Sequence, residues 1–397
     1  RVFHIIHILN KNKYLKYFKY TGEKNMNLTI SKTEFYNTLQ LVSRAISPNS
    51  PQTSLRGLKI DVKDKSMVVT GSDADISIQR TITANEKNKL NILEEGSILI
   101  ESKYLLEIVR KIDSEEIHVE IIDGSLTKFS GNSAVFKING MNPHDYPTID
   151  FSKPANSVVI SSSVMSDIIE QTTFATSIKE TKPVLTGVNF HLANNTLCCT
   201  ATDSYRLAKK TIPFTSSDSF NVTIPSKSLN EVKATMLGDE GEIQIYLNDK
   251  KAQFVNEDMI LQTRLLDGGY PETDRLIPKE FKYTLEINRS DLIHAIDRTT
   301  FIKTDNMTIN RLQCSTDEIV LTNKSQEIGE SHETLVGTFT GEPLDISFSG
   351  NYVMEAARSI RGDKLKIEFV GEMRPFILSS EEDPTILQLV LPVRTYN

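Results

Sequence analysis

A strand-then-helix pattern occurs three times along the chain at a constant spacing. In residues 220–237, Val222 and Ile224 alternate with polar residues as in a strand, and the apolar positions that follow fall on one face of a helix. The same pattern surrounds Ile98 and Ile346, each of which lies 124 positions from Val222. A period of this length predicts tandem copies of a whole domain rather than a solenoid of small units.

A second strand-then-helix pattern stands earlier in each copy, beginning at Met26, Ser157 and Tyr283. Further alternating segments bounded by turn residues follow both patterns. We therefore expect an α+β fold in which each copy contains two helices and about eight strands, in the order β-α-β-β-β repeated. Within residues 220–237, Ser226 is the expected N-cap of the helix.

Linkers that contain Tyr-Pro separate the copies. Residues 144–147 and 268–271 interrupt the strand pattern with proline and glycine, which marks boundaries. We predict domains at 26–150, 151–279 and 280–397. Residues 1–25 place their basic residues after a short apolar run and offer no small-residue cleavage site, unlike a signal peptide. We predict that they form an extension outside the fold.

Composition narrows the class of protein. The 397 residues are 39% hydrophobic and 24% charged, as in a globular protein, and the net charge of −7 argues against a generic nucleic-acid coat. Three cysteines without zinc or disulfide spacing indicate a reducing compartment, hence a cytoplasmic protein, and fit small buried side chains. Cys198 and Cys199 should point to opposite faces of a strand.

Sequence motifs for catalysis are missing. The chain has no phosphate-binding loop, dinucleotide fingerprint, nucleophile elbow or zinc-protease motif, and its seven histidines are scattered. Asp203 and Arg206 could form an acid–base pair, or Asp203 could bind backbone N–H groups in a turn. Asp73 stands in the same turn of the first copy, which favours the turn. We expect no catalytic residue, no metal ligand and no cofactor.

Charge on the six predicted helices is slightly positive. Their formal charges sum to about +3 within a chain of −7, which either marks a basic layer or describes ordinary solvated helix faces.

Six segments in order, on a threefold repeat, resemble the bacterial sliding clamp, the β subunit of DNA polymerase III, particularly that of Gram-positive bacteria. The segments are PVLTG (183–187), ATDSYRL (201–207), IPSKS (224–228), YPETDRLIP (270–278), MRPF (373–376) and LPVR (391–394). The resemblance covers residues 26–397. It implies the DNA-clamp fold, with two three-domain protomers joined head to tail in a ring whose helices surround duplex DNA. A protein of this kind is a processivity factor and not an enzyme.

The resemblance also assigns roles to residues. Basic residues that would face DNA, and that could alternatively serve solubility, are Arg44, Lys103, Arg110, Lys111, Lys179, Lys182, Lys227, Lys233, Arg298, Arg358 and Arg361. Contacts of a sliding protein should be few, directed to phosphates and sensitive to salt. At the ring contact, Phe136 would meet Phe301 and Ile302 of a second protomer, although these residues could instead belong to the core.

Partners in this family insert a short linear motif into a cleft between the second and third domains. They include the polymerase III catalytic subunit, the clamp loader, and other replication and repair proteins. Matching positions are Leu185, Thr202, Ser204, Tyr205, Arg206, Leu207, Pro271, Arg275, Leu276, Ser349, Tyr352, Met373, Pro375, Leu389, Leu391, Pro392, Val393 and Arg394. The leucines would line apolar pockets for a Leu/Phe anchor, or form ordinary core, and Arg206 and Arg275 would flank the peptide. Ser204 and Tyr205 replace the glycine and histidine of some members. We expect residues 386–393 to form a strand of the third copy with exposed apolar side chains, which favours docking over ordinary core because a soluble chain seldom ends in an unburied apolar segment.

The sequence also allows two other hypotheses for the function. One is a monomeric three-domain scaffold that binds peptides without encircling DNA. The other is an enzyme that uses the turn at residues 202–207.

Overall fold

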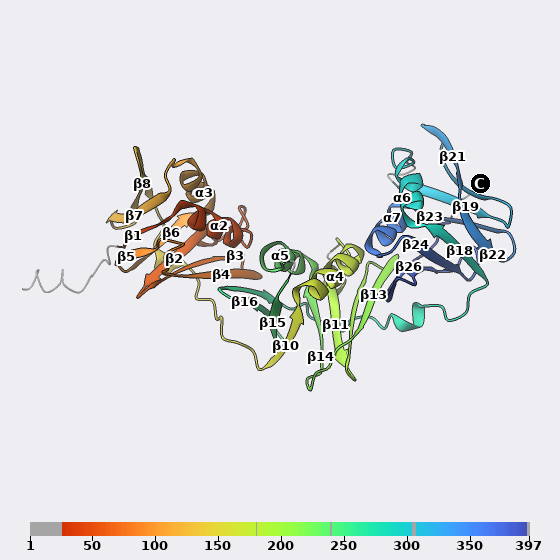
Figure 1. The fold of residues 1–397 in the computed structure, drawn as a ribbon, viewed down its shortest axis with the longest axis horizontal. Helices are drawn as coiled ribbons and strands as arrows, with labels where there is room; N and C mark the ends of the chain where they lie inside the picture. The colour runs from red at the N-terminus through yellow and green to blue at the C-terminus, as the bar shows by residue number, and fades with distance from the viewer. Residues whose placement is uncertain (1–25, 180, 239, 304–306, 395–397) are drawn as a thin grey trace, which may run out of the picture. The chain divides into compact units, whose positions relative to one another are not determined.

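The computed structural model describes residues 26–179, 181–238, 240–303 and 307–394 (Figure 1). The predicted extension, residues 1–25, lies outside the described residues. Contacts divide the chain into two compact units: residues 1–152 with 255–262, and residues 153–254 with 263–397. The third copy and most of the second copy therefore belong to one compact unit, whereas residues 255–262 of the second copy belong to the other.

The three copies repeat the same order of elements. The first copy contains β1 (Asn27–Ser31), α2 (Lys32–Ser43), η1 (Thr53–Arg56), β2 (Gly57–Lys63), β3 (Ser66–Ser72), β4 (Ile76–Thr83), β5 (Asn91–Glu94), β6 (Gly96–Glu101), α3 (Ser102–Lys111), β7 (Glu116–Asp123), β8 (Leu126–Gly131), β9 (Ala134–Asn139) and η2 (Pro143–Asp145). The second contains β10 (Asn156–Ser161), α4 (Ser162–Thr172), η3 (Thr173–Ala175), η4 (Pro183–Thr186), β11 (Gly187–Ala193), β12 (Thr196–Thr202), β13 (Arg206–Pro213), β14 (Phe220–Pro225), α5 (Ser226–Met236), β15 (Glu242–Leu247), β16 (Lys251–Asn256), β17 (Met259–Arg264) and η5 (Asp274–Leu276). The third contains β18 (Tyr283–Asn288), α6 (Arg289–Asp297), β19 (Ile309–Cys314), β20 (Ile319–Ser325), β21 (Gly329–Leu335), β22 (Gly337–Thr340), β23 (Leu344–Ser349), α7 (Gly350–Ser359), β24 (Lys364–Phe369), β25 (Phe376–Ser380) and β26 (Asp383–Val390).

The predicted fold class is confirmed, with two α-helices and eight or nine strands in the described part of each copy. Both strand-then-helix patterns form as expected in all three copies. The predicted N-cap is wrong by one residue, because α5 begins at Ser226 and Pro225 is its N-cap. Proline has no N–H to donate and a fixed φ, so it can end β14 and lead directly into the helix.

Side chains cap two of the other helices. The Ser161 hydroxyl accepts from the N–H of Val164 at the start of α4. The Asn288 side chain accepts from the N–H groups of Ser290 and Asp291 at the start of α6. These bonds satisfy backbone donors that have no partner within the first helical turn.

Antiparallel sheets provide the frame of each unit. In unit 1, one sheet has the order β5-β1-β7-β8-β9, and β17 lies beside β4 in the order β17-β4-β3-β2-β6. In unit 2, nine strands follow the order β14-β11-β12-β13-β26-β25-β24-β18-β22, and four follow β21-β20-β19-β23. The nine-stranded sheet joins the second copy to the third through the β13–β26 pair.

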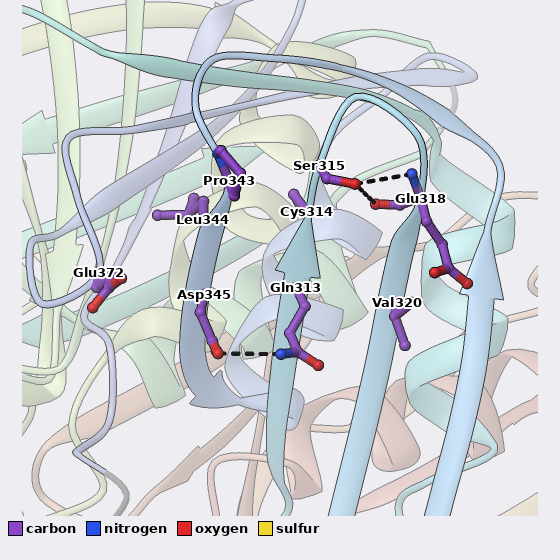
Figure 2. A pocket seen from close by; sticks show the side chains of 9 residues that line it. All are labelled: Gln313, Cys314, Ser315, Glu318, Val320, Pro343, Leu344, Asp345 and Glu372. Atoms are coloured by element: carbon purple, nitrogen blue, oxygen red, sulfur yellow. Dashed lines mark hydrogen bonds between the residues drawn. The ribbon is translucent and has the colours of Figure 1, made fainter.

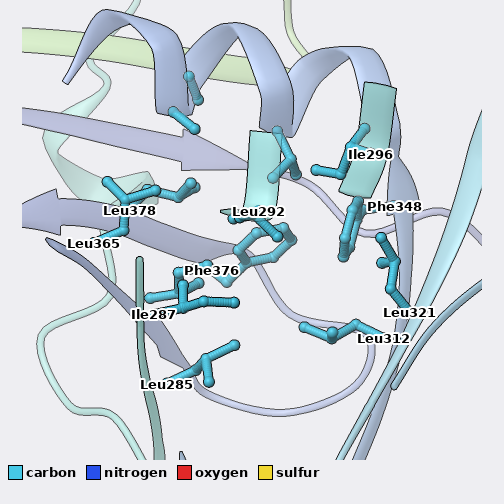
Figure 3. Packing of buried hydrophobic residues seen from close by; sticks show 14 of the residues in the cluster. Leu285, Ile287, Leu292, Ile296, Leu312, Leu321, Phe348, Leu365, Phe376 and Leu378 are labelled. Carbon is cyan, nitrogen blue, oxygen red and sulfur yellow. The ribbon is translucent and has the colours of Figure 1, made fainter. Parts of the chain in front are cut away.

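The core of the third copy shows how its helices are held (Figure 3). Leu292 and Ile296 of α6 lie over Phe348 and Phe376, whose ring centroids are 5.8 Å apart. Leucines and isoleucines of β18, β19, β20 and β24 complete the cluster. Burial of these alternating strand positions beneath the two helices is the main force that holds the helices against the sheet.

The two Tyr-Pro linkers place their tyrosines alike. The hydroxyl groups of Tyr146 and Tyr270 are both buried without a hydrogen-bond partner among the described residues. Burial raises the pKa of both hydroxyls above the ordinary value. Tyr146 packs against Leu55 and Leu99. The first linker therefore marks the end of its domain and is also packed against that domain.

Candidate functional site

The turn between β12 and β13 is built around Asp203. Its Oδ1 accepts from the N–H groups of Tyr205 (2.9 Å) and Arg206 (3.0 Å), while the Thr202 hydroxyl accepts from the N–H of Ser204. In the first copy, the Asp73 carboxylate accepts in the same way from residues 75 and 76, and the Ser72 hydroxyl accepts from Ala74. The structural interpretation of Asp203 is therefore confirmed.

Arg206 has contacts that its counterpart in the first copy, Ile76, cannot make. Its Nε donates to Asp203 Oδ2 at 3.1 Å, Nη1 donates to Glu355 on α7, and Nη2 donates to the carbonyl of Phe174 at 2.6 Å. The guanidinium also lies 4.4 Å from the ring centroid of Tyr352. These contacts leave the side chain only 10% exposed. Arg206 thus links the turn to a helix of the third copy.

Tyr352 stays protonated in this position. Burial raises the pKa of its hydroxyl, and the Asp203 carboxylate adds to the shift against the opposing effect of Arg206. Its ring is a neutral, half-buried surface beside the charged cluster.

An apolar cluster lies along the β13–β26 pair. Leu389 stands opposite Leu207 of β13 and opposite Ile377 of β25, so the three side chains share one face of the sheet. Ile277, Phe281, Leu387 and Leu391 pack against them without being fully buried. We call these seven residues the junction cluster. Its partly buried side chains form an apolar surface where the second and third copies meet.

The side chains of the C-terminal segment are more buried than the sequence suggested. Leu389 and Val390 are buried in β26, and Leu391, Pro392 and Val393 are half-buried. The Leu391 N–H donates to the carbonyl of Tyr205 at 2.9 Å, and the Val393 N–H donates to that of Ser347 at 2.8 Å. The predicted strand is confirmed by β26, whereas the expected exposure of its apolar side chains is wrong, because pairing with β13 satisfies the backbone and packs these side chains into the sheet.

The remaining docking positions fall into two groups. Exposed residues are Ser204, Tyr205, Pro271, Arg275, Leu276, Met373 and Arg394, whereas Leu185, Thr202 and Ser349 are buried and Pro375 is half-buried. Arg275 pairs with Glu272 at 2.9 Å at the surface. The structure thus offers exposed side chains, among them Tyr205, Leu276 and Met373, in addition to the junction cluster.

Sequence reasoning missed Ile277, Phe281, Ile377, Phe174 and Glu355. Residues 376–378 form a continuous apolar run, so no alternation distinguishes Ile377 as a neighbour of Leu389. Glu355 meets Arg206 across 149 positions of sequence, and no local pattern predicts such a contact.

Most of the predicted DNA-facing residues have carboxylate partners. The pairs are Lys103–Glu101, Arg110–Glu107, Lys111–Glu107, Lys233–Glu170, Arg298–Glu333, Arg358–Asp297 and Arg361–Asp167. Arg44, Lys179, Lys182 and Lys227 are also exposed. Exposed ion pairs are weak, so a phosphate can replace the carboxylate at little cost.

The predicted ring-contact residues differ in exposure. Phe136 is half-buried on β9, the edge strand of its sheet, and Phe301 is 67% exposed. Ile302 is buried within its own domain, where its carbonyl accepts from Asn323. Phe301 is therefore the most accessible of the three.

A cavity of about 430 Å³ opens on the third copy (Figure 2). Its lining includes Glu318, Asp345 and Glu372, and Asp345 accepts a hydrogen bond from Gln313 there. None of its nine lining residues belongs to the predicted docking set.

The described residues show no sign of a disulfide or a metal site. The three cysteines are free thiols, with Cys198 half-exposed and Cys199 buried, as expected for opposite faces of a strand. Burial raises the pKa of Cys314 to about 12. The described residues contain no cluster of three potential metal ligands and no helix long and apolar enough to span a membrane.

Comparison with known proteins identifies the family. Residues 26–150, 159–272 and 274–394 match, respectively, the N-terminal, central and C-terminal domains of the DNA polymerase III beta subunit. The beta sliding clamp of Staphylococcus epidermidis is 35% identical over 376 residues, which cover 94% of this chain and all of that protein.

Solved structures agree. The DNA polymerase sliding clamp of Bacillus subtilis has a TM-score of 0.90 at 34% identity and covers 94% of this chain and all of its own. The DNA polymerase III beta chain of Streptococcus pneumoniae has a TM-score of 0.90 at 31% identity and covers 93% of this chain and all of its own. With three matching domains in order and the clamp fold throughout, the chain belongs to the DNA polymerase III beta subunit family, the bacterial sliding clamps.

Proposed function

We propose that two copies of this chain close into a ring around duplex DNA and tether the replicative polymerase to it, without any catalytic step of their own. The domains that form each protomer would be residues 26–150, 151–279 and 280–397. Basic residues on the six helices would face the DNA and contact its phosphates. The protein would act in the cytoplasm, where the chromosome is replicated.

The junction cluster carries the docking part of this proposal. Leu207, Leu389 and Leu391 belong to this cluster, and Tyr205, Leu276 and Met373 are exposed side chains of the same compact unit. An apolar anchor of a linear motif would bury itself against this surface, because a few anchor side chains that fill well-packed, desolvated pockets carry most of the binding energy of such interfaces. Partners would include the polymerase III catalytic subunit, the clamp loader, and other replication and repair proteins.

Arg206 has a different place in the proposal from the one expected. Asp203, Glu355 and the Phe174 carbonyl already accept hydrogen bonds from its guanidinium. Arg206 would therefore support the docking surface through these contacts rather than pair with an acidic residue of the peptide. Arg275, which is 84% exposed, is the better candidate for contact with an acidic residue of the peptide.

Retention on DNA tests encirclement. A clamp loader would place the protein on nicked circular DNA and on the same DNA after linearisation. A topological link predicts slow loss from the circle and rapid loss from the linear form, at a salt concentration that screens phosphate contacts. Equal rates of loss from both forms would rule out encirclement.

A further inference from the structure

A buried polar network lies on the opposite face of the strands that carry the junction cluster. Lys210, on β13, donates from Nζ to Gln171 Oε1 at 2.5 Å and to Thr385 Oγ1 at 2.9 Å, with Asp383 Oδ2 at 4.0 Å. Gln171 Nε2 in turn donates to Asp383 at 2.9 Å. The Lys210 side chain is only 6% exposed, so its charge depends on these partners.

Gln388 extends the network to a helix of the third copy. Its Nε2 donates to the Gln171 carbonyl at 3.0 Å and to Ser359 Oγ at 2.9 Å, and Gln171 Nε2 also donates to the Ser359 carbonyl at 3.0 Å. Gln171 and Gln388 are 2% and 1% exposed. The network therefore joins α4 and β13 of the second copy to β26 and α7 of the third.

Strand geometry connects this network to docking. Ala208 stands opposite Gln388, one step from the Leu207–Leu389 pair. Because side chains alternate between faces, a slip of one residue would move Gln388 into the junction cluster and Leu389 into the network. A polar network that is satisfied in only one register disfavours the slip, since any other register leaves buried donors without acceptors.

The pKa of Asp383 reflects the close contacts within this network. Burial raises the pKa of Asp383, but hydrogen bonds from Thr385 and Gln171 and the charge of Lys210 lower it by more, so its pKa lies below the ordinary value. The carboxylate thus remains ionised beside Lys210.

We propose that Lys210, Gln171 and Gln388 are positioning residues of the docking site: they fix β13 against β26 and so hold the buried Leu207 and Leu389, against which the partly buried side chains of the junction cluster pack. The inference rests on the proposed docking function. A preformed surface binds a peptide more tightly because less ordering is needed on binding.

The first copy supplies a matched control. Arg80 is the fifth residue of β4, as Lys210 is of β13. Arg80 also binds a helix and a segment far away in sequence, through Thr38 Oγ1 of α2 and Asp258 Oδ2 of the β16–β17 turn, both at 3.0 Å. Lys210→Met and Arg80→Met each remove a basic side chain from a polar network. Only Lys210 belongs to a strand that also carries a residue of the junction cluster.

The experiment measures binding of a Gln-Leu-x-Leu-Phe peptide to the full chain by calorimetry, with thermal unfolding recorded in parallel. We expect both variants to unfold at lower temperature, Lys210→Met to lose about tenfold or more in peptide affinity, and Arg80→Met to stay within about twofold of wild type. Lys210→Arg, which keeps the charge and donors, should recover most of the affinity.

Other outcomes would overturn the inference. Unchanged affinity in a folded Lys210→Met protein would do so, as would equal losses in Lys210→Met and Arg80→Met, which would indicate general destabilisation. Should Lys210→Met not fold, Gln388→Leu makes the same test with a smaller change, and unchanged affinity there would also overturn it. A wild-type chain that does not bind the peptide would refute the docking function itself, and the inference with it.

Discussion

At the residue scale, the β12–β13 turn shows how one copy of a repeated turn differs from another. Ala74 and Ser204 hold the same left-handed position in equivalent turns, at φ 81° and 78°. The difference lies two residues later, where Ile76 of the first copy is replaced by Arg206. The Arg206 side chain therefore adds a contact with α7 to a turn that otherwise has the same backbone hydrogen bonds in both copies.

The left-handed backbone at Ser204 has a measurable cost. We expect Ser204→Gly to raise the free energy of unfolding by about 0.5 kcal/mol, because relief of about 1–2 kcal/mol of steric strain exceeds the added entropy of the unfolded chain, about 0.5–1 kcal/mol. Denaturant unfolding would measure the change. Ser204→Val, which is β-branched, should be destabilising, and a stabilising effect of valine would contradict the argument.

Sequence reasoning at this scale succeeded where the signal was local. The Asp203 turn was predicted because a short carboxylate before a strand typically binds nearby N–H groups. Glu355 was missed because its contact with Arg206 depends on the packing of α7 against β13, which no short pattern encodes.

At the element scale, strand β26 determines the site. It is the third copy's last described strand, yet it pairs with β13 of the second copy and completes the nine-stranded sheet. The sequence predicted a strand at residues 386–393, and β26 confirms it as far as Val390. Its burial was mispredicted because pairing with a strand far away in sequence cannot be derived from alternation alone.

Two leucines of this segment should behave differently. Leu389 is 3% exposed and lies between Leu207 and Ile377, so Leu389→Ala should lower the free energy of unfolding by about 2–5 kcal/mol. Leu391 is half-buried beyond the end of β26, and Leu391→Ala should cost about 1 kcal/mol while still weakening peptide binding.

Chemical denaturation and peptide titration would separate the two effects. Similar destabilisation by both variants would contradict the assignment of Leu389 to the core of the junction cluster. Full peptide affinity in Leu391→Ala would remove Leu391 from the docking surface.

At the scale of the whole molecule, the 124-residue repeat predicted most of the architecture. All three copies, both helices of each, and the clamp family follow from that one period together with six short segments. The repeat does not predict how two protomers assemble, because assembly depends on surface residues that differ from copy to copy.

Phe301 provides a test of assembly. If it lies at the ring contact, wild type should scatter light with about twice the chain mass of 44.7 kDa, and Phe301→Asp should shift the protein towards 44.7 kDa by placing a charge in an apolar interface. Leu276→Asp changes a similarly exposed residue of the docking surface and should leave the mass unaltered. A wild-type mass near that of one chain would favour the monomeric scaffold.

The β13–β26 pair also has a consequence for biosynthesis. Leu207 and Leu389 meet across 182 positions of sequence, so a ribosome translates nearly half of the polypeptide between them. Until β26 has emerged, β13 is an unpaired sheet edge that can join wrongly with another nascent chain. With the proposed docking site, the same delay would keep partners from engaging an unfinished chain, because the junction cluster does not exist before its second strand is made.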